Sequence, residues 1–333
     1  MLQFAILGAG RIGKVHGAAI ADTPGAALAA VADPVAEAAR SLAQAHDCAV
    51  RSIDDIEADP AIDAVVICTP TDTHADLIER FARAGKAIFC EKPIDLSLAR
   101  VRACLGVVEE TGATLMVGFN RRFDPDFRAL KARVESGVIG RVEMVTITSR
   151  DPAPPPIEYI ARSGGIFRDM TIHDFDVARW LLGEEVETVQ ATGSVLVDPA
   201  IGEAGDYDSA NVLLTTAGGR QCVITNSRRA SYGYDQRLEV HGSDGMVAAD
   251  NRHEANIRTA TAEGIAQPPL LDFFMTRYAE AYRAEIAAFI AAIAEDAPPP
   301  ATGADGAMAL ALADAAGIAA REGRSVALEE VTR

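Results

Sequence analysis

The chain has 333 residues, and its length, composition and charge exclude several classes of protein. A hydrophobic content of 49% supports sizeable buried cores, which a disordered chain lacks. The formal net charge of −17 argues against nucleic acid or an anionic membrane as the main partner.

The sequence has no recognisable targeting or membrane-spanning segment. Leu2–Leu7 is a short apolar run that glycines follow at once, with no basic region before it. No apolar stretch is expected to approach the length that a bilayer requires. We therefore expect a cytoplasmic protein with reduced thiols and no structural zinc, because five cysteines are scattered without CxxC spacing: Cys48, Cys68, Cys90, Cys104 and Cys222.

The first motif is a glycine-rich turn between a predicted strand and a predicted helix. The strand is Gln3–Leu7, and the turn carries glycines at positions 8, 10 and 13 in the GxGxxG spacing. In this context Gly8 permits the tight turn, Gly10 lets backbone amides approach a pyrophosphate, and Gly13 lets the helix pack on the strand. The start of the helix then faces the phosphates of a dinucleotide.

An acidic residue follows at the distance that a dinucleotide site requires. Asp33 ends a second predicted strand twenty residues after Gly13, where its carboxylate can bind the adenosine ribose. Pro34 follows, and no Arg or Lys is adjacent to hold a 2′-phosphate, so NAD is favoured over NADP. Arg11 and Ile12 lie within the turn, and Arg11 faces either the pyrophosphate or solvent.

Strands and helices then alternate, which predicts a parallel, doubly wound sheet over residues 1–119. The predicted elements after the second strand are a helix at Ala36–Ala45, a strand at Ala64–Cys68, a helix at Thr73–Ala84, a strand at Ala87–Cys90, a helix at Ser97–Thr111 with Ser97 as its N-cap, and a strand at Thr114–Gly118. Ligands bind beyond the carboxyl ends of the strands in such sheets.

Two polar segments stand at those strand ends. The segment Thr69-Pro70-Thr71-Asp72-Thr73-His74 either lines the nicotinamide side of the cofactor or is a capped loop, and capping is the simpler interpretation for His74. The second segment is Glu91-Lys92-Pro93, where the proline restricts the backbone before it. An ammonium held at Lys92 can reach the hydroxyl groups of a substrate, although a surface lysine is the alternative.

Residues 120–333 have a different pattern, which predicts a second α/β domain with an open, mostly antiparallel sheet. A rigid loop with four prolines spans Asp151–Pro156, and a long helix is predicted at Phe273–Glu295. A last helix at about 304–322 is expected to pack back on the first domain. The predicted strands follow one another with little helix between them, at Arg141–Ser149, Val186–Val197, Ser209–Thr216, Arg220–Ser227, Gln236–His241 and Met246–Ala249.

The stretch Ser163–Asp176 carries a second candidate site. Asp169, His173 and Asp176 lie four and three positions apart, so a helix places all three on one face. A carboxylate beside a histidine can orient the imidazole for proton transfer. The same three residues also fit two alternatives, namely acids that complement the dipole at a helix N-terminus and a set of metal ligands.

The ordered set of motifs resembles the glucose-fructose oxidoreductase/inositol dehydrogenase/MocA family over essentially the whole chain. It comprises Gly8–Gly13, Glu91-Lys92-Pro93 and Gly165–Asp176, with the further segments Val117–Asp124, Thr148–Pro152 and Ser231–Arg237. Within that family the chain is most similar to the bacterial members that oxidise inositol. The resemblance implies a Rossmann domain, a second domain with an open sheet, a homotetramer and a site without metal.

The resemblance also implies roles for individual residues. The catalytic lysine of the family maps to Lys92, and its Asp-x-x-x-His pair maps to Asp169 and His173, with His173 as the general base. The expected reaction is NAD-dependent oxidation of myo-inositol to 2-keto-myo-inositol (scyllo-inosose). The expected polyol contacts are the three catalytic residues with Asn120, Arg121, Asp151, Asp176 and Tyr232, and the expected cofactor contacts are Gly8, Gly10, Arg11, Ile12, Gly13, Asp33, Thr69, Pro70, Thr71, His74, Glu91 and Lys92.

The sequence leaves two further functions open. One is a dehydrogenase of another cyclitol or sugar, such as scyllo-inositol, chiro-inositol or glucose, because one scaffold serves many substrates. The other is a regulatory protein that binds NAD without catalysis. The presence of Lys92, Asp169 and His173 together argues against the regulatory protein.

Overall fold

The computed structural model describes residues 1–333 and divides them into two compact units. The first unit comprises Met1–Asp124 and Ala279–Leu310, and the second comprises Pro125–Tyr278 and Ala311–Arg333. By contacts, residues 279–310 thus join the nucleotide-binding part rather than the part that follows residue 119. The reason is packing, because helix α12 (Ala279–Glu295) lies against helix α1 (Arg11–Ala21).

A six-stranded parallel sheet forms the centre of the first unit. Its order is β3-β2-β1-β4-β5-β6, which is the order of a dinucleotide-binding Rossmann sheet and confirms the predicted fold class. Its central strands are buried on both faces, so their sequences are continuous apolar runs rather than alternating patterns. The strands are β1 (Leu2–Leu7), β2 (Ala26–Ala32), β3 (Ala49–Val50), β4 (Ala64–Ile67), β5 (Ala87–Cys90) and β6 (Leu115–Val117).

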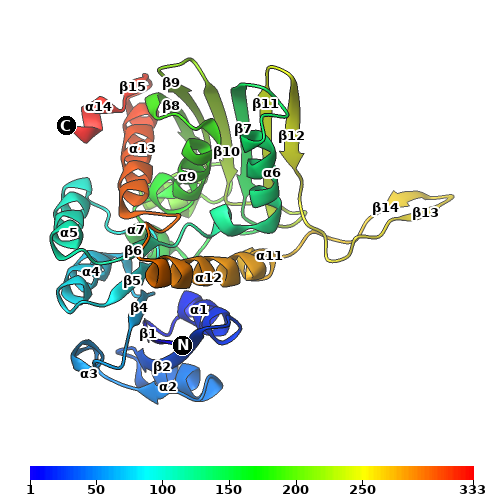
Figure 1. The fold of residues 1–333 in the computed structure, drawn as a ribbon. Coiled ribbons are helices and arrows are strands. Elements are labelled where there is room, and N and C mark those ends of the chain that lie inside the picture. Colours follow the sequence, from blue (N-terminus) through cyan, green and yellow to red (C-terminus); the bar gives the residue numbers. More distant parts are fainter. The chain divides into compact units, whose positions relative to one another are not determined.

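The helices of the first unit alternate with its strands along the chain (Figure 1). The Ser97 side chain accepts a hydrogen bond from the amide of Arg100, which confirms the predicted N-cap. The further helices of this unit are α2 (Ala36–Ala45), α3 (Ile53–Ala58), η1 (Thr71–Thr73), α4 (His74–Arg83), α5 (Leu98–Thr111) and η2 (Asn120–Phe123), where η marks a 3₁₀ helix.

The second unit is built on a seven-stranded sheet of order β12-β11-β7-β10-β9-β8-β15. Its pairs are antiparallel except β7 with β10, so the expectation of a mostly antiparallel sheet is confirmed. The strands are β7 (Val142–Arg150), β8 (Val186–Ser194), β9 (Ser209–Thr216), β10 (Gln221–Ser227), β11 (Asp235–Gly242), β12 (Gly245–Ala249) and β15 (Val326–Ala327).

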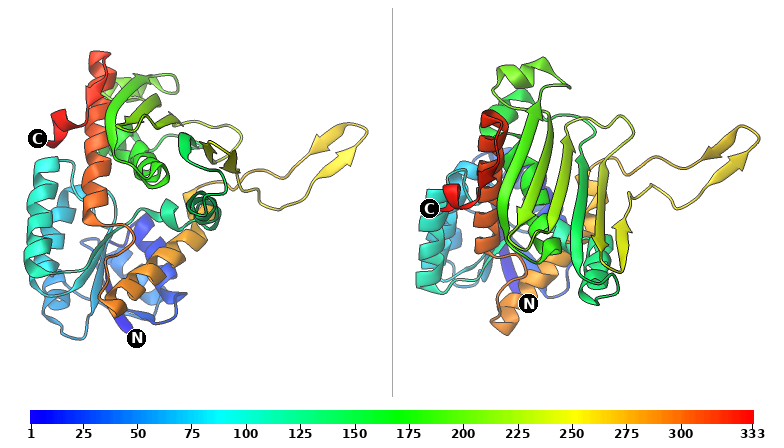
Figure 2. Two further views of the ribbon diagram at one scale, coloured as in Figure 1. Left: turned by 45° about the horizontal axis from the view of Figure 1, so that its top comes forward. Right: turned by 90° about the horizontal axis from the view of Figure 1, so that it is seen from above.

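One face of this sheet is covered by helix and the other is open. Helix α9 (Thr171–Leu182) packs on β7 and β10, where alternate residues such as Val145 and Ile147 are buried. The opposite face carries Met144 and Val223, which are both more than 40% exposed. Figures 1 and 2 show α9 on one side of the sheet and no helix of this unit on the other.

Several short elements complete the second unit. A small hairpin, β13 (Thr259–Thr261) with β14 (Gly264–Ala266), projects from the sheet on two extended segments (Figures 1 and 2). The short helices are α6 (Pro125–Glu135), α7 (Ile157–Ser163), α8 (Ile166–Asp169), α10 (Pro199–Glu203), α11 (Phe274–Arg277) and α14 (Glu329–Thr332).

The prediction of one continuous helix at Phe273–Glu295 is wrong. The segment consists of α11 and α12, with Tyr278 between them in a non-helical conformation. Tyr278 is almost completely buried, and its ring makes edge contacts with the rings of Phe127 and Tyr234. The burial of this aromatic side chain outweighs the helical pattern of the segment around it.

The prediction that no apolar stretch approaches the length of a membrane span is wrong for the last long helix, α13 (Gly303–Glu322). It is the one helix that is long and apolar enough to cross a membrane by length and composition. Of its apolar 18-residue window, 56% is buried inside the protein, which is typical of the core helix of a globular protein. The boundary between the two units falls within this helix, after Leu310.

Candidate active site

The glycine turn of the first unit has the geometry that a bound pyrophosphate requires. Gly8 has a φ of +100°, and a Cβ atom there would lie 2.6 Å from the carbonyl oxygen of Cys68. A Cβ atom on Gly13 would lie 2.0 Å from the carbonyl oxygen of Gly8. At Gly10 a Cβ atom would meet nothing within 4 Å. Gly8 and Gly13 are therefore required by the fold, whereas Gly10 borders open space at the start of α1.

The N-terminus of α1 has no capping group from its own chain. Gly10 is the N-cap, no side chain accepts from the first amides, and the first turn contains no acid. Such amides are available to a phosphate group, which the helix dipole also favours. Arg11 is exposed, Ile12 is partly buried and Gly13 is buried, so this donor set fits the diphosphate of a dinucleotide.

Asp33 lies directly after β2, beside the glycine turn. One of its carboxylate oxygens accepts a 2.6 Å hydrogen bond from the amide of Ala9, and the other accepts one of 2.7 Å from the amide of Val35. These two bonds fix the orientation of the carboxylate. Each oxygen keeps a further lone pair, so the group can also accept from the hydroxyls of a ribose.

The segment after β4 is tied to the segment after β5 by His74. Its Nδ1 atom lies 2.8 Å from the carbonyl oxygen of Pro93, and its Nε2 atom lies 2.7 Å from that of Thr69. The hydroxyls of Thr69 and Thr73 are 2.6 Å apart, so this loop is internally bonded as well. Pro70 is exposed and Thr71 is partly exposed at the carboxyl end of the sheet.

The Glu91-Lys92-Pro93 segment directly follows β5. Lys92 is partly exposed, whereas Glu91 and Pro93 on either side of it are buried. The Glu91 carboxylate lies 2.6 Å from Nε2 of His16, which belongs to α1. A Cβ atom on Gly118 would lie 3.2 Å from this carboxylate, so a glycine there leaves room for it.

A second buried carboxylate lies near this pair. His16, Glu91 and Glu285 each present a ligand-type atom, and these atoms lie within 4.8 Å of one another. Glu285 belongs to α12, is fully buried, and neither of its carboxylate oxygens has a hydrogen-bond partner. Burial, and then the charge of Glu91, raise the pKa of the Glu285 carboxyl group well above its ordinary value.

Asn120 and Arg121, two expected polyol contacts, belong to η2 of the first unit. Both are more than 90% buried, so neither is the solvated surface residue that its polarity suggests. Helix η2 packs against α12, which accounts for that burial.

In the second unit the stretch Ser163–Asp176 begins at the last residue of α7 and continues as two helices, α8 and α9, rather than one. Asp169 ends α8, Met170 intervenes, and His173 and Asp176 lie in α9. Gly164 and Gly165, with φ of +84° and +86°, make the turn before α8. The expectation of one continuous helix is therefore corrected, although the backbone of Met170 is itself right-handed helical, with φ of −96° and ψ of −58°.

The Asp169 carboxylate is held by two groups that the sequence did not suggest. It accepts a 2.8 Å hydrogen bond from the hydroxyl of Tyr159 and lies 3.3 Å from a guanidinium nitrogen of Arg228. Arg228 is only 1% exposed and also lies 3.5 Å from the carboxylate of Asp206. Burial nevertheless raises the pKa of Asp206 above its ordinary value.

A second polar network lies beneath α9. Asp174 is completely buried and accepts a 2.8 Å hydrogen bond from the side-chain amide of Asn226. The Asn226 oxygen in turn accepts a 2.7 Å bond from the hydroxyl of Thr171. These bonds anchor the helix of His173 to strand β10. Asp176 is also completely buried, whereas His173 is partly exposed.

The other expected polyol contacts of this unit lie at the ends of strands. Asp151 follows β7 and is partly exposed, with its amide bonded to the carbonyl of Ser227. Tyr232 is 51% exposed, and its hydroxyl donates a 2.6 Å hydrogen bond to Asp235 and accepts one from Arg150. Tyr234, by contrast, is buried against other aromatic rings.

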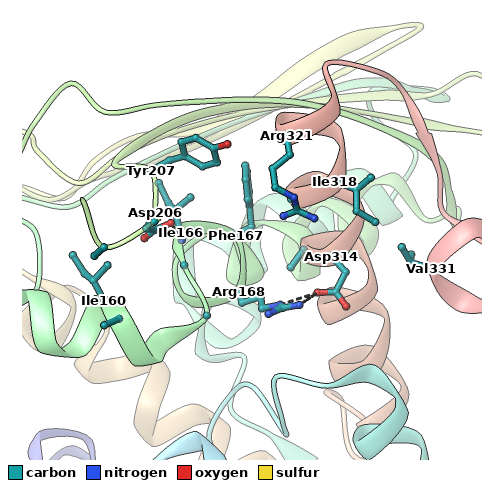
Figure 3. Close-up of a pocket in the computed structure, with 17 residues that line it drawn as sticks. Ile160, Ile166, Phe167, Arg168, Asp206, Tyr207, Asp314, Ile318, Arg321 and Val331 are labelled. Carbon is teal, nitrogen blue, oxygen red and sulfur yellow. Dashed lines mark hydrogen bonds and ion pairs between the residues drawn. The ribbon is translucent and has the colours of Figure 1, made fainter. Parts of the chain in front are cut away.

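A cavity of about 480 Å³ borders the turn before α8 (Figure 3). Apolar side chains such as Phe167 and Ile318 line it, and an ion pair of 2.7 Å joins Arg168 to Asp314 across it. Asp169, His173 and Asp176 are not among its lining residues. This cavity is therefore separate from the expected catalytic groups of the same unit.

Sequence reasoning missed four residues of these sites: His16, Tyr159, Arg228 and Glu285. His16 had the only available signal, its position on the apolar side of a predicted helix. Arg228 and Arg229 follow β10 as an adjacent basic pair, and nothing in the sequence distinguishes the buried member from the exposed one.

Comparison with known proteins matches two parts of the chain to protein families. Residues 2–119 match the oxidoreductase family with an NAD-binding Rossmann fold, and residues 127–248 match the GFO/IDH/MocA C-terminal domain. The chain belongs to the GFO/IDH/MocA family. It is therefore an oxidoreductase whose cofactor is NAD, as the glycine turn and Asp33 predict.

Three relatives show how closely other members of the GFO/IDH/MocA family match this chain. Inositol 2-dehydrogenase of Rhizobium meliloti is 64% identical over 98% of this chain and 99% of its own length. A crystal structure described as a putative myo-inositol dehydrogenase from Sinorhizobium meliloti has a TM-score of 0.97, with 64% identity over 98% of this chain and 100% of that one. Scyllo-inositol dehydrogenase from Lactobacillus casei, crystallised with NAD(H) and scyllo-inositol, has a TM-score of 0.91, with 29% identity over 99% of both chains.

Proposed function

We propose that this protein oxidises myo-inositol to 2-keto-myo-inositol with NAD as the acceptor. The observation that carries the proposal is the 64% identity, over nearly the full length of both chains, to a protein named inositol 2-dehydrogenase. The Rossmann glycine turn and the polar groups of α8 and α9 support it. An uncharged ring of hydroxyl groups also suits a site rich in Asp, Asn, Arg and Tyr side chains.

The oxidation removes one hydride and one proton from the same carbinol group. NAD, when bound, supplies the acceptor for the hydride that leaves the carbinol carbon. The hydroxyl proton goes to His173, which acts as the general base, and the C–O bond becomes a carbonyl. The balanced products are 2-keto-myo-inositol, NADH and one proton.

Three residues carry the proposed chemistry. Asp169 orients His173, and the bonds of Asp169 to Tyr159 and Arg228 support this role because they fix its carboxylate. Lys92 binds the reacting hydroxyl and stabilises negative charge on that oxygen as the proton leaves. The buried neighbours of Lys92 support a fixed position for this ammonium.

The remaining contacts in the proposed site divide between cofactor and polyol. The amides after Gly10 hold the diphosphate, and Asp33 binds the adenosine ribose. The proposed cofactor contacts also include Gly8, Arg11, Ile12, Gly13, Thr69, Pro70, Thr71, Glu91 and Lys92. His74 is left out of this set, because its ring nitrogens face the backbone of Pro93 and Thr69. The polyol hydroxyls are bound by Asn120, Arg121, Asp151, Asp176 and Tyr232.

We infer further that the protein is a cytoplasmic homotetramer. The open face of the seven-stranded sheet supports assembly, because Met144, Val223 and Met246 on that sheet are all more than 40% exposed. All five cysteines are free thiols, which agrees with a reducing compartment. Light scattering coupled to gel filtration measures the mass of the assembly, and a monomeric mass would contradict the tetramer.

A substrate panel tests the proposed reaction. The purified protein is supplied with myo-, scyllo- and chiro-inositol and with glucose, each with NAD and NADP, and NADH or NADPH formation is followed by absorbance. We expect the highest kcat/KM with myo-inositol and NAD, and no loss of activity in chelator. A higher kcat/KM on another polyol would reassign the substrate, and NAD binding without turnover would favour a regulatory protein.

The role of His173 is tested by substitution. We expect His173→Ala to lower kcat by about 10² to 10⁴, which is the typical contribution of a positioned general base, and to leave NADH binding unchanged. His241→Ala, at an exposed position of β11, is the matched control and should keep full turnover. Near-normal turnover of His173→Ala would mean that another group takes the proton.

A further inference from the structure

His16 links the helix after the glycine turn to the residue before Lys92. Its ring is completely buried on α1, and its Nε2 atom donates to the Glu91 carboxylate at 2.6 Å. Edge contacts with the rings of Phe89 and Tyr282, at centroid distances of 5.0 and 5.5 Å, fix the plane of the imidazole. A hydrogen bond between an imidazole and a carboxyl group in such a buried place is strong and directional.

His74 links the loop after β4 to the residue after Lys92. Its ring is 2% exposed, and its two nitrogens reach the carbonyl oxygens of Pro93 and Thr69 at 2.8 and 2.7 Å. Both ring nitrogens of His74 face backbone carbonyls, to one of which a neutral imidazole donates, so no ring nitrogen is left for a direct contact with the cofactor. Its effect on the site therefore passes through the two loops that it joins.

We propose that His16 and His74 are positioning residues for Lys92, which they hold by its two sequence neighbours, Glu91 and Pro93. The inference rests on the proposed role of Lys92 in the oxidation. It assigns both histidines a function that differs from cofactor contact. It also connects helix α1 and the loops after β4 and β5 into one bonded unit.

The buried group of His16, Glu91 and Glu285 fits a metal site less well. Nitrogen and carboxylate ligands lie about 2.1 Å from a metal ion, so two of them at right angles or wider are about 3 Å apart or more. The His16 nitrogen and the Glu91 oxygen are closer, at 2.6 Å, which is the distance of a short hydrogen bond.

The position of Lys92 matters because a small displacement of a catalytic group lowers the rate strongly. A misplacement of about 1 Å can cost about 10²-fold in rate without loss of the fold. Loss of the His16 bond releases Glu91, and loss of the His74 bond releases Pro93, so residues 91–93 can shift. Strand β5 before them stays paired with β4 and β6. We therefore expect an effect on kcat rather than on the binding of NAD.

Asparagine and glutamine substitutions separate a specific hydrogen bond from simple burial. The amide nitrogen of Asn is as many bonds from Cβ as Nδ1 of histidine, and that of Gln is as many as Nε2. At position 16 the bond to Glu91 uses Nε2, so His16→Gln should retain it and His16→Asn should lose it. At position 74 the bond to Pro93 uses Nδ1, so His74→Asn should retain it and His74→Gln should lose it.

The expected result is an opposite order of activity at the two positions. His16→Asn and His74→Gln should lower kcat on myo-inositol about tenfold or more, and His16→Gln and His74→Asn should stay within about threefold of the wild type. KM for NAD should stay within about twofold in all four variants. If Asn and Gln have equal effects at each position, or if KM for NAD rises while kcat holds, the positioning role is wrong.

A second measurement does not depend on the proposed activity. Hydrogen exchange, followed by mass spectrometry, should become faster in peptides spanning residues 87–98 for His16→Asn and His74→Gln only, with His241→Asn as the surface control. Unchanged exchange in those two variants would overturn the inference even if inositol is the substrate. If the wild type oxidises no polyol but the exchange pattern appears, the proposed function fails and the link to residues 91–93 stands. A stoichiometric metal ion that is lost in Glu285→Gln would overturn the role of His16.

Discussion

The cofactor edge of the first unit and the polar face of the second unit are built in different ways. At the cofactor edge the turn depends on backbone conformation, with Gly8 and Gly13 within six residues of each other. In the second unit, Asp169 is held by Arg228, which lies 59 residues further along the chain. A site made by backbone is therefore encoded by local spacing in the sequence, whereas a site of paired side chains depends on how distant segments pack.

The largest loss of stability is expected when the buried Arg228, which holds Asp169, is replaced. Arg228→Met removes the buried cation that lies between Asp169 and Asp206, and leaves two carboxylates without it. The loss of one partner from a buried ion pair costs about 3–5 kcal/mol of unfolding free energy. The midpoint of unfolding in urea measures it. Turnover should fall as well, because Asp169 loses one of the groups that fix it.

Arg229 provides a matched control for Arg228. It is the next residue, it is exposed, and its guanidinium donates a hydrogen bond to the carbonyl of Leu196. Arg229→Met should change the unfolding free energy by no more than about 0.5 kcal/mol, as surface substitutions usually do. Equal losses in the two variants would mean that charge number, and not the buried pairing, is responsible.

The same difference explains how much the sequence could predict. The order of strands, the cap at Ser97 and the glycine turn depend on residues close together in the chain, and the structure confirms them. The bond between His16 and Glu91 joins residues 75 positions apart, and no periodicity reports such a pair. The break at Met170 was also missed, because the residues on both sides of it have helical patterns.

A smaller loss is expected when the glycine turn is filled. Gly13→Ala places a Cβ atom 2.0 Å from the carbonyl oxygen of Gly8, and neither backbone segment can move without disturbing the strand or the helix. Overpacking of this kind typically costs about 1–3 kcal/mol, and the unfolding midpoint in urea should fall accordingly. An unchanged midpoint would show that the turn can relax, contrary to a site built from rigid backbone.

Gly10→Ala alters the same turn at the position that borders open space, so it separates cofactor binding from stability. Gly10 has an ordinary φ of −70°, and a Cβ atom there meets nothing within 4 Å, so stability should not change. The added methyl group should instead obstruct the diphosphate, and we expect the Kd for NADH to rise about tenfold, which is about 1.4 kcal/mol. Titration of NADH fluorescence measures the Kd, and an unchanged Kd would place the diphosphate elsewhere.

The smallest expected effect concerns Glu285, and it depends on pH. A carboxyl group whose pKa is raised in the folded chain keeps its proton at a pH where the unfolded chain has lost it. Its contribution to stability is therefore greatest below the unfolded pKa of about 4.3 and is lost as pH rises toward the folded pKa. Glu285→Gln removes this titration, so the thermal midpoint of the variant should fall less between pH 5 and pH 8.

At neutral pH two effects of Glu285→Gln oppose each other. The variant escapes the cost of keeping a proton on the acid, but its amide is itself buried beside His16 and Glu91, and an unpaired buried amide costs about 1–3 kcal/mol. The difference in thermal midpoint between the variant and the wild type should therefore move in favour of the variant as pH rises from 5 to 8. Glu295→Gln, at an exposed position of α12, is the control and should follow the wild type. Parallel curves for Glu285→Gln and the wild type would show that Glu285 is ionised in the fold, and the cofactor edge would then hold a second buried charge.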